Sequence, residues 1–427
     1  MRLMSSVRIG RASAALILLA TMGLWNFPSA AAGPEVFLAT LDAIERHQME
    51  NWLAARAVHD HQVNAYWSSV NAKRTERKRK KGTSTPLGPD DYVMTFPPTY
   101  AGPEISASLA KRWTAFQEKE EAKAPPPKPR PGIPEFLANA KAIYDFVPER
   151  ISEREFKTRY AREAIALGLT KEQVVRIYAL ETSGLGAADM VAGIHPIRKT
   201  GTPISTAIGY AQLLSANTVN ELAKSGSKFI ERLRRLPAGD PARAAQINGK
   251  IAALQKMYAV ARSVPDDWGR HVALGGTPKG LGIHAINVDG DIGPWLQVLK
   301  LNGLKIMAEK KGVSRLSGAE IELMNLAGPG TGLEMMQPAG RAAPTPNFFE
   351  RNAYGRNTIV RGKTSAELIA ALDERMEENI KNAGAVEFAQ VFDELGGGAA
   401  AIPAAPAPAP ARAAREDVGV PQPFGSH

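Results

Sequence analysis

One glutamate in the sequence has the placement that a general acid requires. Residues 171–182 are predicted to form a helix that Gly184 ends. Along this helix Glu181 continues an apolar stripe formed by Val174, Ile177 and Tyr178. Burial and the negative end of the helix dipole both raise the pKa of such a carboxyl, and a glycosidic general acid must be protonated near neutral pH. Periodicity alone favours a simpler interpretation, in which a helix-terminal glutamate turns into solvent.

Two later segments carry residue types that suit a sugar polymer. In residues 205–214 (Ser-Thr-Ala-Ile-Gly-Tyr-Ala-Gln-Leu-Leu), the small side chains and Gly209 allow a sugar ring to approach the backbone. Gln212 offers a carbonyl and an amide to hydroxyl and acetamido groups. Residues 325–330 (Asn-Leu-Ala-Gly-Pro-Gly) predict a rigid turn that lines a groove. Taken singly, Gly209 and Gln212 are equally explained as an ordinary helix start with a capping amide.

In this order the three segments resemble the lytic transglycosylases and related lysozyme-like muramidases. In that superfamily a helix ending in Glu-Ser precedes a short irregular lobe, a Gly-Ala-x-Gly-Leu-Met-Gln pattern and a Tyr-Asn-Ala-Gly-Pro-Gly turn. The resemblance covers roughly residues 181–360 and implies that Glu181 is catalytic. It also implies contacts with the substrate from Ser205, Gly209, Tyr210, Gln212 and Gly328.

A late tyrosine of the superfamily lies near the catalytic glutamate, and Tyr354 is the candidate for it here, although a core-filling role explains it equally well. The chain departs from the pattern in three places. Thr182 stands where the superfamily usually has Ser, and Leu326 stands where its turn usually has Asn. The lobe between the first two motifs is also longer than in compact members.

The acids near Glu181 bear on the reaction. Between residues 181 and 215 the only other acid is Asp189, whereas hydrolytic lysozymes work with two carboxylates. The resemblance therefore implies a peptidoglycan lytic transglycosylase that cleaves the MurNAc–GlcNAc bond with one glutamate and leaves 1,6-anhydro ends. It implies no cofactor and no metal. Two alternatives stay open: a lysozyme-type hydrolase of peptidoglycan or chitin that uses Asp189, and a non-catalytic wall-binding scaffold, which Leu326 and the enlarged lobe favour.

The elements that must position these residues are helical. Residues 135–395 carry repeated capping boxes, starting at Ser152, Thr170, Ser317 and Thr364. Glycines at helix ends follow the same rhythm, at residues 168, 184, 312 and 384. Strand signals are confined to short pieces around 191–210 and 281–288. The predicted fold is mainly α, a lysozyme-like helical domain with a small irregular or β lobe.

An N-terminal helical region, residues 33–123, precedes this domain. Residues 34–81 predict one long amphipathic helix, whose closing basic run, 73–81, is best explained as solvated. A second helix is expected at 104–121. A Pro-rich linker, 124–134, separates this region from the domain, and the Ala/Pro-rich tail, 396–427, should not pack. The N-terminal region is a candidate for binding an envelope protein partner.

The start of the chain reads as an export signal. Arginines precede an apolar run at residues 12–24, and small residues follow, so a signal peptide of residues 1–32 is predicted, with an uncleaved anchor as the alternative. The chain has no cysteine, which excludes lipid attachment through that residue. Its formal charge of +10 favours anionic polymers. We therefore expect a periplasmic or cell-envelope protein that binds peptidoglycan and not nucleic acid, without a stable membrane anchor after cleavage.

Overall fold

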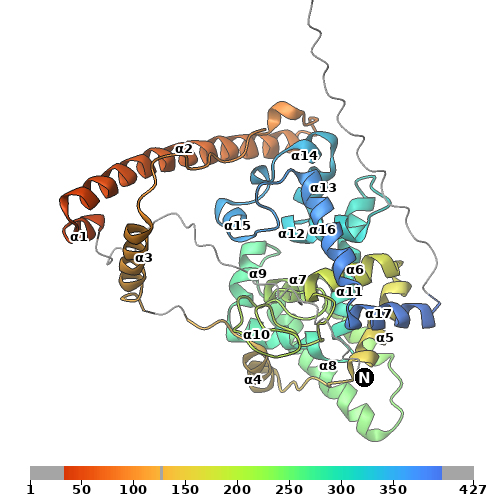
Figure 1. Cartoon of the computed structure of the whole chain (residues 1–427). Helices are drawn as coiled ribbons and strands as arrows, with labels where there is room; N and C mark the ends of the chain where they lie inside the picture. The colour runs from red at the N-terminus through yellow and green to blue at the C-terminus, as the bar shows by residue number, and fades with distance from the viewer. Residues whose placement is uncertain (1–32, 126–127, 397–427) are drawn as a thin grey trace, which may run out of the picture.

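The computed structural model describes residues 33–125 and 128–396, and within them the architecture is helical (Figure 1). The predicted mainly α class is confirmed, and no extended strand forms in the described ranges. The predicted signal peptide and all but the first residue of the predicted tail lie outside them. None of the helices in this part of the chain is both long and apolar enough to cross a membrane.

The N-terminal region forms an arm. Its helices are α1 (Pro34–Leu38), α2 (Ala43–Gly82) and α3 (Ala107–Glu121), with a short 3₁₀ turn, η1 (Pro89–Asp91), between the last two. Figure 1 shows α2 reaching away from the rest of the molecule, with α1 and α3 at its far end. There a separate small core is formed by Phe37, Leu41, Met49, Trp52, Leu109 and Trp113.

The single helix predicted over residues 34–81 is broken between α1 and α2. Asp42 caps α2, and its carboxylate accepts hydrogen bonds from the backbone N–H groups of Ile44 and Glu45. This cap starts a new helix, and α1 can then fold back onto the small core. The prediction of one continuous helix is therefore wrong at this point.

The basic run that closes α2 fastens the arm to the body. Arg77 is only 2% exposed. Its Nε donates to Oε1 of Glu334 at 2.7 Å, one Nη donates to the carbonyl of Asn347 at 2.6 Å, and its guanidinium lies 4.6 Å from the ring of Tyr92. Lys81 pairs with the same glutamate. The interpretation of this run as solvated is wrong for Arg77, because a distant acid in the body neutralises it.

The body contains the remaining helices. These are α4 (Ile133–Tyr144), α5 (Glu153–Ala166), α6 (Lys171–Thr182), α7 (Ser215–Arg234), α8 (Pro241–Ala261), α9 (Trp268–Gly275), α10 (Pro278–His284), η2 (Ala285–Val288), α11 (Gly293–Glu309), α12 (Gly318–Ala327), α13 (Pro329–Met336), α14 (Pro338–Ala342), η3 (Thr345–Asn347), α15 (Arg351–Arg356), α16 (Ser365–Asn379) and α17 (Ala383–Glu394). Helix α6 packs against α12, α16 and α17, while α11 packs against α5, α7 and α12.

An irregular lobe joins α6 to α7. Single bridges, and not strands, hold it together, at Val191–Ile208, Ile194–Gly201 and Ile208–Leu213. The strand signals around residues 191–210 correspond to these bridges. The other predicted strand piece, 281–288, is wrong, because that segment forms the end of α10 and the turn η2 and is buried on all sides. A fully buried apolar run does not distinguish strand from helix by periodicity.

Candidate active site

Helix α6 begins as the sequence predicts and is held at its start to α12. The hydroxyl of Thr170 accepts from the backbone N–H of Gln173 at 3.2 Å, which completes the predicted capping box. The amide of Gln173 donates to the carbonyl of Leu316 at 2.7 Å, and the carboxylate of Glu172 accepts from the backbone N–H of Gly318 at 3.1 Å. These contacts fix α6 against the helix that follows residue 317.

The other end of α6 is equally constrained. The helix ends at Thr182, and Ser183 adopts left-handed geometry with φ of 53°. The side-chain amide of Asn382 donates to the carbonyl of Ser183 at 2.8 Å, and the N–H of Ala385 donates to the carbonyl of Gly184 at 3.0 Å. Because both ends are held, the last turn, which carries Glu181, has a defined position.

A second acid lies beside Glu181. Glu322, on α12, is buried with only 4% exposure, whereas Glu181 is partly buried. Their carboxyl groups share a hydrogen bond. The side-chain amide of Asn325 donates to Oε1 of Glu181 at 3.2 Å and to the carboxyl of Glu322 at 3.4 Å. Two carboxyls can share a hydrogen bond only when one of them keeps its proton, so this pair holds a proton that isolated acids would lose.

The pKa values follow from this geometry. Burial raises the pKa of Glu181 to about 7, although hydrogen bonds from Glu322 and Asn325 act in the opposite direction. Burial, followed by the charge of Glu181, raises the pKa of Glu322 well above its usual range. The direction for Glu181 matches the sequence prediction. Its main cause is burial.

One cation acts on the pair from a distance. Lys300, on α11, is partly buried, and burial lowers its pKa. Its charge favours the ionised form of both Glu322 and Glu221, the latter on α7. No ion pair joins Lys300 to the carboxyl pair among the described residues. The site is therefore a carboxyl pair that holds a proton, and the charge of Lys300 lowers the pKa of Glu322 only from a distance.

Glu322 was missed by sequence reasoning, which considered only acids close to Glu181 along the chain. A local signal exists nevertheless. Glu322 stands inside a capped helix, with Ile321 on one side and Leu323 and Met324 on the other, and it precedes Asn325 by three residues. Acid and amide at this spacing lie on one helix face.

The 205–214 segment lies against the core and not along an open groove. Gly209 has φ of 79°, and a Cβ there would lie 2.5 Å from Nε2 of Gln297. Oε1 of that glutamine accepts from the backbone N–H of Tyr210 at 2.9 Å. The glycine is therefore required for the close approach of a buried side chain. Its contact with a sugar stays a prediction.

Tyr210 is also an internal residue. It is 1% exposed, its hydroxyl donates to Oε2 of Glu153 at 2.7 Å, and its ring lies 4.9 Å from that of Tyr178. The structure thus places this side chain in the interior, and its role in substrate binding stays a prediction. It packs the base of the lobe against α5 and α6.

The other two predicted site residues of this segment, Ser205 and Gln212, are half-buried and hydrogen-bonded within the lobe. The amide of Gln212 donates to the carbonyls of Gly209 at 2.8 Å and Met190 at 3.2 Å. The hydroxyl of Ser205 accepts from the N–H of Ala207 at 3.2 Å. These bonds give Gln212 and Ser205 a part in shaping the lobe, and their contact with a ligand stays a prediction.

The two remaining predicted site residues, Gly328 and Tyr354, lie in different parts of the structure. Gly328, with φ of 87°, ends α12 and begins α13, so the predicted turn follows Asn325 directly. Tyr354 packs its ring 5.6 Å from that of Trp67 on the arm, and its hydroxyl accepts from the N–H of Gly362 at 3.0 Å. This placement supports the packing interpretation of Tyr354 over proximity to the carboxyl pair.

Asp189, the second acid that a hydrolase would need, has partners of its own. Its carboxylate lies 2.6 Å from Arg150 and 3.7 Å from Lys199. It is thus bound in surface ion pairs and does not share in the hydrogen bonds of the carboxyl pair.

No protein-family model, no curated protein and no solved structure matches this chain.

Proposed function

We propose that this chain cleaves the glycan strands of peptidoglycan as a lytic transglycosylase, with Glu181 as acid and then as base. One observation carries the proposal. Glu181 ends a rigidly held helix, and its carboxyl, with a pKa raised to about 7, shares a proton with a buried neighbour. Such a group can donate a proton at neutral pH and accept one afterwards.

The two acids differ in access. Glu322 is buried, while Glu181 retains partial exposure at the end of its helix. Only Glu181 can therefore meet a ligand. Glu322 then acts as a positioning residue that supplies a hydrogen bond when the carboxylate of Glu181 forms. Asn325 contributes a second donor to the same oxygen, Oε1.

The reaction balances without water. Glu181 gives its proton to the glycosidic oxygen, the bond from C1 to that oxygen breaks, and the substrate's acetamido group stabilises the oxocarbenium charge. The carboxylate of Glu181 then takes the proton of the sugar's 6-hydroxyl, and the oxygen forms a bond to C1. The products are a free leaving strand and a 1,6-anhydro end, and the enzyme regains its starting protonation state.

The lyase reaction is preferred to hydrolysis on distance. Glycosidases that use two carboxylates hold them about 5 Å or more apart, on either side of the bond to be cleaved. Glu322 is hydrogen-bonded to Glu181 and so is too close to serve as the second group. The carboxylate of Asp189 forms ion pairs with Arg150 and Lys199. One working carboxyl is what the transglycosylase reaction needs.

The test is digestion of isolated sacculi, with mass spectrometry of the released fragments. The wild type should release anhydro-muropeptides, and Glu181→Gln should lower the rate by about 10² to 10⁴. Glu374→Gln, an exposed acid on α16, is the matched control and should leave the rate unchanged. Release of reducing ends without anhydro products would show that the enzyme is a hydrolase and not a lyase. Full activity of Glu181→Gln would show that Glu181 does not take part in the reaction.

A further inference from the structure

One face of α7 carries a row of cations that leads away from the carboxyl pair. Beyond Glu221 the row is Lys224, Lys228, Arg232 and Arg235, at intervals of three or four residues. Side chains with this spacing lie above one another on a helix. At one end Glu221 feels the charge of Lys300, which also acts on the carboxyl pair. The acid at the start of the row and Glu322 of the carboxyl pair therefore both feel the charge of Lys300.

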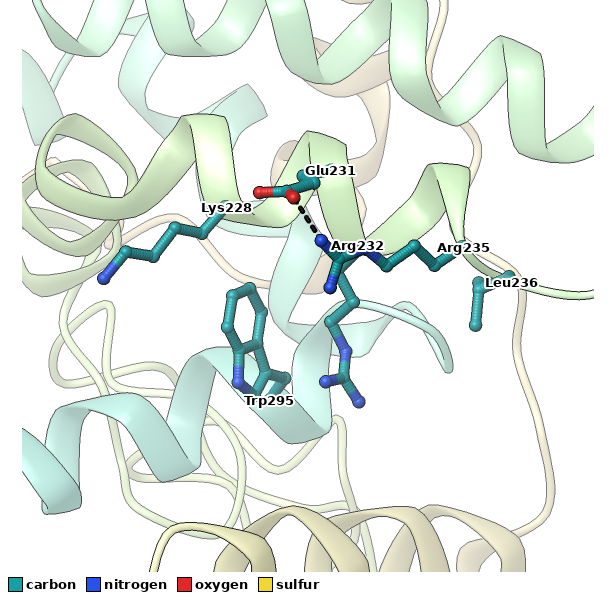
Figure 2. Close-up of a pocket in the computed structure, with 6 residues that line it drawn as sticks. All are labelled: Lys228, Glu231, Arg232, Arg235, Leu236 and Trp295. Carbon is teal, nitrogen blue, oxygen red and sulfur yellow. Dashed lines mark hydrogen bonds and ion pairs between the residues drawn. The ribbon is translucent and has the colours of Figure 1, made fainter.

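The far end of the row borders an aromatic hollow. Two adjoining hollows, of about 350 and 460 Å³, share Trp295, Arg232 and Leu236 in their walls. Figure 2 shows the indole of Trp295 below α7, between the side chains of Lys228 and Arg232. The ring meets Phe229 edge-on at 4.3 Å, and the guanidinium of Arg232 lies 5.0 Å from its centroid. The indole is thus held in place by the core behind it.

Some cations of this groove are neutralised and others are not. Arg232 pairs with Glu163, Arg235 with Glu231, and Arg159 and Arg243 with Asp291. Lys228 and Arg162 are exposed and line the hollows, and neither takes part in an ion pair within the described ranges. Each of the two hollows that share Trp295 is therefore lined by one positive charge that no described acid pairs with.

The helices α7 and α11 connect the hollow to Glu221 and Lys300. Along α7 Lys228 is about two turns from Glu221, and along α11 Trp295 is about one and a half turns from Lys300. The two helices pack against each other, and Phe229 meets Trp295 at their contact.

We propose that the groove around Trp295 binds a carboxylate-bearing portion of the wall polymer, with Lys228 and Arg162 as the charge-reading groups and the indole as the platform for a sugar ring. The apolar face of a sugar stacks on a fixed aromatic surface, and free cations select anions over neutral ligands. The groove thereby distinguishes peptidoglycan, whose lactyl and stem-peptide groups carry carboxylates, from neutral chitin. The identity of the polymer rests on the proposed function.

The test is equilibrium binding to the full chain carrying Glu181→Gln, so that no ligand is consumed. The probes are soluble peptidoglycan fragments with their stem peptides and neutral N-acetylglucosamine oligomers of equal length. Lys228→Glu should weaken binding of the acidic fragments about tenfold and leave the neutral oligomers unchanged. Lys256→Glu, an exposed lysine on α8, is the matched control and should change neither. Trp295→Leu should weaken both probes.

Equal effects of Lys228→Glu and Lys256→Glu would overturn the proposal, even if Trp295→Leu failed to fold. Tighter, Lys228-dependent binding of a single-stranded oligonucleotide would assign the groove to nucleic acid and also overturn it. Sacculus cleavage by the wild type separates the two proposals. If the wild type cleaves sacculi but binding does not depend on Lys228, only the proposal for the groove is rejected. If binding depends on Lys228 but no cleavage occurs, the groove is supported and the proposed enzymatic function is rejected.

Discussion

Within the described residues, bonded cations compensate the acids around Lys250, whereas none is bonded to the pair of Glu181 and Glu322. In the first group, Lys250 on α8 is 3% exposed and donates to Asp291 at 2.6 Å and to Glu149 at 2.8 Å. It also reaches the fully buried Asp289 at 3.0 Å. Arg243 adds a two-pronged pairing with Asp291 at 2.8 Å. Arg159 also donates to Asp291, at 2.9 Å, so three acids share three bonded cations.

The second group is the pair of Glu181 and Glu322, which receives an amide from Asn325 and no bonded cation. The pKa of Asp291 in the first group and the pKa values of the carboxyl pair are shifted in opposite directions. Burial opposes ionisation at Asp291, yet hydrogen bonds and charges from Lys250 and Arg243 bring its pKa below the usual range. In the carboxyl pair burial prevails, and both pKa values rise. In the first group the ionised form of Asp291 is thus favoured, while burial raises the pKa of the neighbouring Asp289. The carboxyl pair retains a proton.

Removing the central cation of the first group should give the largest effect. Lys250→Met keeps the shape of the stem but leaves the fully buried Asp289 without a cation and removes one partner from Asp291 and Glu149, which should cost about 3–5 kcal/mol of stability. Thermal unfolding should show a Tm lower by roughly 10 °C. Lys256→Met, one and a half turns further along the same helix and exposed, should change the Tm little. Equal Tm values for both variants would mean that the cluster is not what holds α8.

Breaking the second group should affect activity more than stability. Glu322→Gln still offers a donor to Glu181 and should retain most of the cleavage rate, whereas Glu322→Ala removes the donor and should lower the rate by about tenfold. Because the missing donor had lowered the pKa of Glu181, the alkaline limb of the rate profile should also move to higher pH in Glu322→Ala. A merely structural role predicts similar losses in both variants and no displacement of the profile.

The contrast also marks how far the sequence could lead. Helix α6 was predicted from Lys171 to residue 182 and has those bounds, and Glu181 lies where its stripe indicated. The turn at Gly328 likewise follows its capped helix. These features depend on neighbours within a few residues, where propensity, capping and glycine geometry decide the backbone.

What the sequence did not reveal depends on contacts across long stretches of chain. Glu322 meets Glu181 only because α6 and α12 pack together, and Arg77 is neutralised by Glu334 from another helix. Gly209 leaves space for the side chain of Gln297. The sequence alone cannot distinguish a glycine required by a neighbouring side chain from a glycine required by a bound sugar. Local patterns identify such residues as unusual but do not name their partners.

The smallest expected effect is a pH dependence that has opposite sign for Asp291 and for the carboxyl pair. The raised pKa of Glu181 and Glu322 means that the folded chain binds protons that the unfolded chain releases, so their contribution to stability is complete at acidic pH and declines as pH rises toward about 7. The lowered pKa of Asp291 means that its contribution is present at neutral pH and declines in acid. Glu322→Gln, which cannot ionise, should therefore gain about 1 kcal/mol relative to wild type between about pH 5 and pH 8. Thermal unfolding of the two proteins at both pH values measures this gain as a Tm difference of about 2 °C that grows with pH. A difference that instead grew toward acid would mean that the carboxyl pair is ionised like the Lys250 group, and Glu181 would then lack the proton that the proposed reaction begins with.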